Sequence, residues 1–152
     1  MDVAEAEEKG YQLAKHFKLH LHPENMKARN ALSFDPLPKG VTIDKIYADF
    51  FRYLYEHTQT FFKERELQGT KIWRDVLRKK KIEFVVTHPN GWTLKEQAFL
   101  RKAVVEGGLI AESSAAQYVH MLAEAEASVH FVVFHAGGSV ESRLKVRLQY
   151  PL

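Results

Sequence analysis

The stretch that decides the fold runs from Ile82 to Ile110 and reads IEFVVTHPNGWTLKEQAFLRKAVVEGGLI. Residues 82–86 are mostly β-branched or aromatic and too few for a helix, so they predict an interior strand. Pro89-Asn90-Gly91 predicts a tight turn, because proline fixes one backbone dihedral and glycine can adopt a positive one. Thr93-Leu94-Lys95-Glu96 matches a capping box, which predicts a helix that the Gly107-Gly108 pair can end.

Upstream of this stretch, residues 43–62 predict a long helix. Apolar residues recur there at three- and four-residue steps, and Thr42 or Asp44 can cap the first turn. The apolar face is broader than packing against one sheet requires, so we expect this helix to be packed on two sides or partly exposed. A shorter helix is predicted over 70–78. The aromatic residues that widen the face of the long helix are Phe51, Tyr53, Tyr55 and Phe62.

The two ends of the chain give weaker patterns. Residues 11–22 alternate imperfectly and predict a short strand, and the proline and asparagine residues of 23–40 predict an irregular connection. Residues 122–135 conflict, because alanine and glutamate at 123–127 favour a helix whereas valine and phenylalanine at 129–134 favour a strand. Residues 143–150 alternate cleanly between apolar and polar side chains, which predicts a half-exposed strand.

Composition narrows the classes of function. The 152 residues, 45% of them apolar, predict one domain over 1–152 with a mixed α/β fold. The absence of cysteine excludes disulfides, thiolate zinc sites and cysteine nucleophiles. No leader sequence or membrane-spanning apolar run is recognisable, so we expect a cytoplasmic protein without a membrane partner. A net charge of +3, spread along the chain, does not indicate a nucleic-acid partner.

The candidate catalytic groups are carboxylates. Glu124 and Glu126 stand at the start of an apolar run, where one of them could orient a metal-bound water. The competing interpretation is two solvated acids in the first turn of a helix, where the helix dipole favours negative charge.

Other polar residues admit similar pairs of interpretations. His20 and His22 would present both imidazoles to one side of a strand and could bind a metal, but no third ligand stands at a recognisable spacing. His88 could act as a general base or simply as a hydrogen-bonding turn residue. The basic run Arg78–Lys81 could bind phosphate or form a solvated helix end. Residues alone therefore predict an α/β domain and no definite activity.

Four segments together resemble the nucleotide-binding domain of the seventy-kilodalton heat-shock protein family, and in particular its divergent actin-like ATPase branch common in fungi. The resemblance covers residues 10–134, the middle of that domain, and leaves 135–152 as a divergent C-terminal strand. The segments are HFKLHLHPENMK (His16–Lys27), LPKGVTIDKIYADFFRYLYEHTQTFF (Leu37–Phe62), the opening stretch Ile82–Ile110, and LAEAEASVHF (Leu122–Phe131).

The resemblance implies a partial actin-like, ribonuclease H-like ATPase lobe with a mixed sheet and flanking helices. It implies ATP and Mg²⁺ as cofactors, and it places Glu124 at the acid of the family's Asn-Glu-Pro-Thr-Ala-Ala element, beside the attacking water. In the family this acid opens the helix that links the lobes, which makes 122–134 helical, with its valines and phenylalanines buried.

The departures from the family bear on activity. Ala125 and Glu126 replace the proline and threonine that follow the acid. The family's two glycine-rich phosphate hairpins are missing, apart from a remnant at 135–139 that comes too early and has histidine in place of aspartate. Because amides of those hairpins clamp the phosphates, we expect a truncated ATPase-lineage domain that binds no nucleotide tightly and lacks ATPase activity by itself. The alternative is a non-enzymatic interaction module that binds a protein partner or self-associates through its exposed lobe surface.

Overall fold

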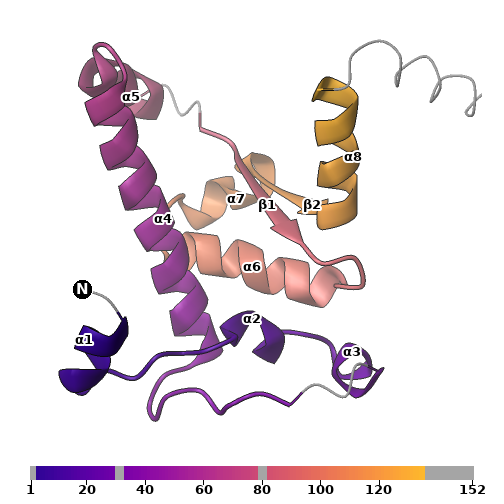
Figure 1. Ribbon diagram of the computed structural model, residues 1–152. Helices are drawn as coiled ribbons and strands as arrows, with labels where there is room; N and C mark the ends of the chain where they lie inside the picture. The colour runs from indigo at the N-terminus through magenta and orange to yellow at the C-terminus, as the bar shows by residue number, and fades with distance from the viewer. Residues whose placement is uncertain (1–2, 30–32, 79–81, 136–152) are drawn as a thin grey trace, which may run out of the picture.

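The computed structural model describes residues 3–29, 33–78 and 82–135, which fold into an α/β arrangement around a small parallel sheet (Figure 1). The expected strand at 143–150 and the remnant hairpin beyond His135 lie outside the described residues. In chain order the elements are α1 (Val3–Glu8), α2 (Phe17–His20), α3 (Glu24–Arg29), α4 (Ile43–Arg65), α5 (Gly69–Arg78), β1 (Phe84–His88), α6 (Leu94–Glu106), α7 (Glu112–Tyr118), β2 (Val119–Ala123) and α8 (Glu124–His135).

The sheet of the described residues is a parallel pair, β1 and β2, joined by a crossover through α6 and α7. Phe84 lies opposite Val119 and His88 opposite Ala123, so the two strands start and end together. Phe84 and Val86 pack toward α6, while Val85 on the other face is 60% exposed. Only one edge of β1 is paired within this part of the chain, so β1 is not the interior strand that the sequence predicted.

The core lies between the sheet, α6 and α4. One cluster joins Tyr47, Trp92 and Leu100, and the other joins Val104 and Val119. Phe51 of α4 packs against both clusters, so the long helix and the crossover share one core.

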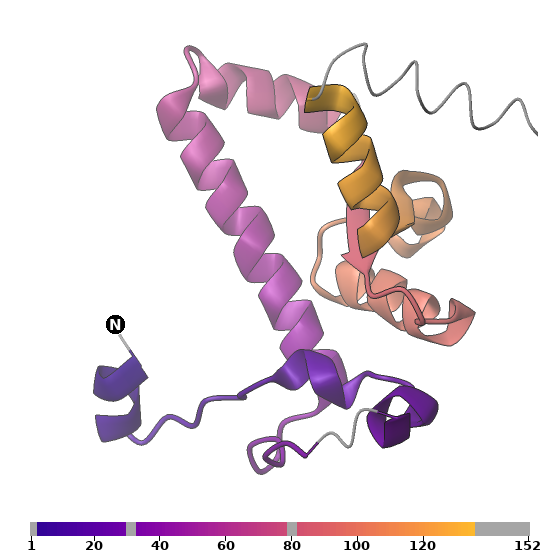
Figure 2. The same ribbon diagram turned by 45° about the vertical axis from the view of Figure 1, so that its right-hand side comes forward.

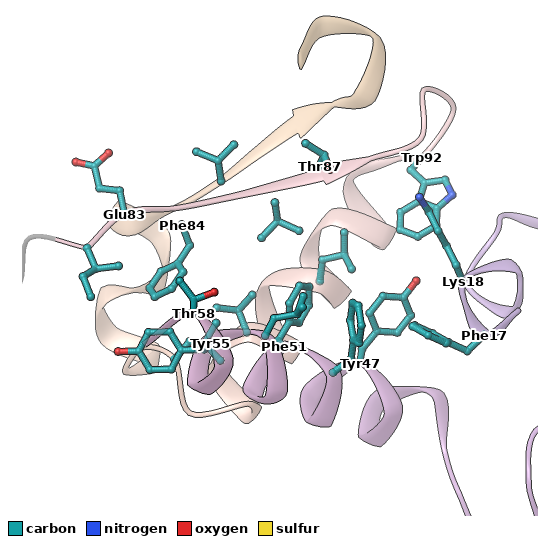
Figure 3. Close-up of a pocket in the computed structure, with 18 of the residues that line it drawn as sticks. Phe17, Lys18, Tyr47, Phe51, Tyr55, Thr58, Glu83, Phe84, Thr87 and Trp92 are labelled. Atoms are coloured by element: carbon teal, nitrogen blue, oxygen red, sulfur yellow. The ribbon is translucent and has the colours of Figure 1, made fainter. Parts of the chain in front are cut away.

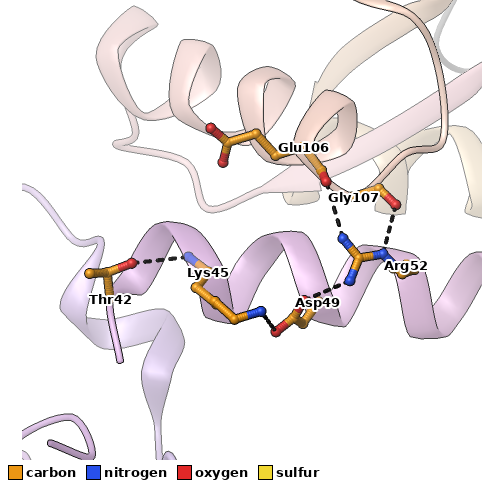
Figure 4. Close-up of polar contacts among 6 residues, drawn as sticks. All are labelled: Thr42, Lys45, Asp49, Arg52, Glu106 and Gly107. Carbon is orange, nitrogen blue, oxygen red and sulfur yellow. Dashed lines mark hydrogen bonds and ion pairs between the residues drawn. The ribbon is translucent and has the colours of Figure 1, made fainter. Parts of the chain in front are cut away.

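The long helix α4 confirms the prediction over 43–62. The hydroxyl of Thr42 accepts a hydrogen bond from the amide of Lys45 at 3.3 Å and so satisfies one of the unpaired donors of the first turn. Further along, the guanidinium of Arg52 donates to the carbonyl oxygens of Glu106 and Gly107, each at 3.2 Å (Figure 4). These carbonyls lie at the end of α6, where a cation is favourable, so Arg52 fixes α4 to α6 at this point.

The capping box at the start of α6 is also confirmed. The carboxylate of Glu96 accepts hydrogen bonds from the amide and hydroxyl of Thr93, both at 2.7 Å. Burial disfavours the charged form, but the two hydrogen bonds from Thr93 outweigh it, and the pKa of Glu96 lies below its ordinary value of 4.5.

We therefore predict a pH-dependent cost for Glu96→Gln. At neutral pH it should destabilise the protein by about 1 kcal/mol, because the charged acceptor is lost. A lowered pKa in the folded state adds stability above the unfolded-state pKa, and that stability disappears as the pH falls through the folded-state pKa. The stabilities of the two chains in urea unfolding should thus converge once the pH falls below the folded-state pKa of Glu96, which lies below 4.5. Thr93→Ser keeps both hydrogen bonds and should behave as wild type; a pH-independent difference for Glu96→Gln would contradict the prediction.

The strand expected over 11–22 is wrong. Its centre forms the single helical turn α2, whose aromatic residue Phe17 meets Tyr47 and Phe50 edge-on at ring-centroid distances of 5.2 and 5.5 Å. Packing of Phe17 on α4 decides the conformation here, and the alternating pattern does not. The irregular connection expected over 23–40 contains the helix α3.

The conflict over 122–135 is resolved in two parts. Leu122 and Ala123 complete β2, and the helix α8 then begins at Glu124, as the family resemblance implied for that acid. The expected burial of α8 is wrong, because no residue of this helix is buried and Phe134 is 83% exposed. Residues 129–134 are helical because β1 ends opposite Ala123, which leaves no paired strand for β2 to follow further.

Candidate functional site

Glu124, the predicted catalytic acid, lies at the edge where the two parallel strands end. Its carboxylate forms an ion pair with the amine of Lys18 at 2.6 Å, and both side chains are about half exposed. Asn90, in the turn after β1, accepts a hydrogen bond from the amide of Ala125 at 3.3 Å. The carboxyl edge of a parallel sheet is a common place for ligands.

The chemistry around Glu124 is less favourable. Glu126 has a different neighbour, His130, whose ring nitrogen lies 3.9 Å from the carboxylate, so the two acids do not converge. Among the described residues no group of three acidic or imidazole side chains is arranged to hold a metal ion. The geometry is that of two solvated acids in the first turn of a helix, with one surface ion pair.

The two histidines of the N-terminal segment do not act together. His20 donates from Nε2 to the carbonyl of Asp35 at 3.1 Å, and Nδ1 of His22 accepts from the indole of Trp92 at 3.3 Å. Burial, with the positive charge of Lys18, lowers the pKa of His22, which keeps Nδ1 free to accept. His22 therefore holds the N-terminal segment against the core residue Trp92, and His20 holds α2 to the connection that precedes α4.

The remaining candidates are structural or lie elsewhere. His88 is buried, and its Nδ1 donates to the carbonyl of Pro89 at 2.9 Å, so the ring stabilises the turn. Gly91 in that turn has the expected positive φ, 114°. Of the basic run Arg78–Lys81, residues 79–81 lie outside the described chain.

A second candidate site is a groove of about 790 Å³ between α4 and β1 (Figure 3). Aromatic side chains, among them Phe51 and Tyr55, rise from α4 toward the strand and form one wall. The lining is mostly apolar, with few polar side chains. The lining residues are Phe17, Lys18, Tyr47, Phe50, Phe51, Leu54, Tyr55, Thr58, Trp73, Ile82, Glu83, Phe84, Val85, Val86, Thr87, Trp92, Leu100, Val104 and Leu109.

The groove follows the open edge of β1, by which we mean the edge that does not pair with β2. Consecutive residues from 82 to 87 all line it. Successive side chains of a strand point to opposite faces, so a cavity on one face would be lined by alternate residues only. Because side chains from both faces of β1 line the groove, the groove runs along the backbone edge of the strand. Unpaired amides and carbonyls are available at this edge.

One buried polar group lies at the α2 end of this groove. Tyr47 is 5% exposed, and its hydroxyl has no hydrogen-bond partner among the residues that the structure describes. Figure 3 shows the hydroxyl directed away from α4, toward the end of the groove that Lys18 and Trp92 border. Burial raises the pKa of Tyr47, so the group is a neutral donor and acceptor.

Sequence reasoning predicted Glu124 but neither its partner Lys18 nor the open edge of β1. Lys18 and Glu124 are 106 positions apart in the sequence, so no local pattern links them. The aromatic excess on α4 was the one signal that pointed toward the groove.

Comparisons with known proteins give no match: no family model, no curated protein and no solved structure is similar to this chain. Within the described ranges, no helix has both the length and the apolar character needed to cross a lipid bilayer.

Proposed function

We propose that this chain is a non-enzymatic protein-interaction module that binds an extended peptide segment in the groove between α4 and β1. The observation that carries the proposal is the open edge of β1 beside an apolar wall. An added strand would pair its backbone with β1 and place alternate side chains against the aromatic residues of α4. The backbone would supply affinity, and the apolar wall would select the sequence.

A bound strand would be stabilised because it covers both the unpaired edge of β1 and the exposed apolar side chains of α4. Exposed strand edges promote unspecific pairing, and proteins usually cover them. Phe50 and Leu54, on the groove side of α4, are 41% and 43% exposed. A strand that covered such side chains would gain roughly 25 cal/mol for each Å² of apolar area removed from water.

Calorimetric titration with a short peptide of alternating valine and threonine tests this proposal, because such a peptide favours an extended strand. Leu54→Asp should weaken binding by roughly ten- to a hundredfold, since it places a charge where the bound peptide would cover an apolar side chain. Tyr53→Asp is the matched control: Tyr53 is 60% exposed on the same helix and does not line the groove. Equal effects of the two variants, or no binding at all, would contradict the proposal.

A truncated ATPase is the second candidate, favoured by the position of Glu124 at the carboxyl edge of the parallel strands. The same titration with Mg-ATP in place of the peptide separates the two candidates. We expect no saturable heat, because one carboxylate that is already paired with Lys18 replaces none of the amides that clamp a triphosphate. Binding of Mg-ATP that Glu124→Ala abolishes would favour the ATPase candidate.

A further inference from the structure

We propose that the bound peptide carries a phenylalanine at one end, and that its ring enters a second cavity beyond the start of β1. This inference rests on the proposed function of the groove and names the side chain that selects the partner. The second cavity has a volume of about 180 Å³ and lies between α5, α7 and the start of β1. The peptide is then held by one side chain at its end as well as by its backbone.

The second cavity is continuous with the groove, because the two share part of their walls. Figure 3 shows Tyr55 and Phe84 at one end of the groove, with Lys18 and Trp92 at the opposite end. A strand added beside Phe84 directs alternate side chains to the face of the sheet that Phe84 occupies, so the last of them meets the shared wall. The side chains that line both cavities are Tyr55, Ile82, Phe84 and Leu109.

The walls of the second cavity belong to elements that are packed in place. Figure 2 shows α5 leaving the end of α4 at a sharp bend and running toward the end at which β1 begins. Trp73 of α5 packs against Tyr55 of α4 at a ring-centroid distance of 5.8 Å. On the other side, Ala115 fixes α7, because it is buried in one core cluster with Val119. A cavity with walls held in this way is formed before binding, so a side chain that enters it orders little else.

Size and lining favour a phenyl ring as the occupant. An apolar cavity of about 150 Å³ accepts one benzene molecule, so a cavity of about 180 Å³ has room for one ring and little more. The rings of Tyr55, Phe84 and Tyr118 form part of the wall, and aromatic rings pack well against one another edge to face. No charged side chain is among the described residues that line this cavity, so a charged anchor would lose water without gaining an opposite charge.

Calorimetric titration of the full chain tests the inference with a set of related peptides. The set consists of the valine-threonine peptide and the same peptide with one phenylalanine added at its first or at its last position. We expect one of the two phenylalanine peptides to bind roughly ten- to a hundredfold more tightly than the plain peptide, because its ring is buried in the second cavity. The other should bind like the plain peptide, because its ring lies at the opposite end of the groove.

Two neighbouring serines of α7 provide a variant and its matched control. Ser114 lines the second cavity, so Ser114→Phe should fill it and remove the gain that the phenylalanine peptide shows. Ser113 is exposed and does not line the cavity, so Ser113→Phe should keep the gain. Both variants should bind the plain valine-threonine peptide as the wild type does, because the groove itself is unchanged.

The outcomes separate this inference from the proposed function. A gain at one end of the peptide that Ser114→Phe removes and Ser113→Phe keeps supports the phenylalanine anchor. An equal gain at both ends, no gain at either, a gain that survives in Ser114→Phe, or a larger gain from leucine than from phenylalanine overturns it. In those cases binding of the plain peptide still supports the function of the groove. If no peptide of the set binds the wild-type chain, both the anchor and the proposed function are wrong.

Discussion

Replacing Leu100 by alanine should destabilise the protein by about 3 kcal/mol, the largest effect that we expect from a single truncation. Leu100 is 2% exposed and packs in the cluster that joins α6 to Tyr47 of α4 and to Trp92 after the turn. The truncation removes apolar contacts and leaves a cavity that rigid neighbours on three elements cannot fill. Equilibrium unfolding in urea, followed by tryptophan fluorescence, measures the change because Trp92 is in the same cluster.

The matched control for this truncation is Leu94→Ala. Leu94 belongs to the same helix, undergoes the same chemical change and is 80% exposed. Its replacement should change the free energy of unfolding by less than about 0.5 kcal/mol. Similar losses for both variants would mean that α6 does not form the centre of the core.

Replacing Gly107 by valine should cost about 2 kcal/mol or more, because α4 and α6 come too close there for a side chain. A Cβ atom on Gly107 would lie 2.8 Å from the carbonyl oxygen of Ala48, a backbone atom of α4 that cannot turn aside. The helices would separate, and the hydrogen bonds of Arg52 to the end of α6 would weaken with them. Thermal unfolding should show the loss, with Gly107→Ala intermediate between wild type and valine.

The neighbouring glycine separates crowding from backbone conformation. Gly108 has a φ of 79°, but a Cβ atom there would meet nothing within 4 Å. Gly108→Asn should therefore cost less than about 1 kcal/mol, since asparagine tolerates the left-handed conformation. If Gly108→Asn proved as costly as Gly107→Val, the close approach of α4 would not be the cause.

The functional proposals depend on the same arrangement of α4. Arg52 and Gly107 fix this helix against α6. The aromatic side chains of α4 therefore stand opposite β1, and the groove lies between them. A change that separates α4 from α6 should therefore widen the groove as well as destabilise the fold. The ion pair of Lys18 and Glu124 is different, because both groups are half exposed and the pair contributes little to stability.

The sequence by itself determined the features whose interactions lie within a few residues. The turn at Gly91 and the capping box of Thr93 and Glu96 were predicted, and the structure confirms them. Two positions were left open for the cap of the long helix and for the left-handed end of α6, and the structure selects Thr42 and Gly108. Each rests on a local hydrogen bond or a backbone preference, which the residue type alone fixes.

Only the tertiary structure decided which surfaces are covered. The alternation over 11–22 was outweighed by the packing of Phe17 on α4, and β1 proved to have an open edge. The apolar residues of α8 remained exposed, although the family resemblance implied that they would be buried. Pairing and burial depend on contacts between residues far apart in sequence, so a pattern shows which side chains need covering but not what covers them.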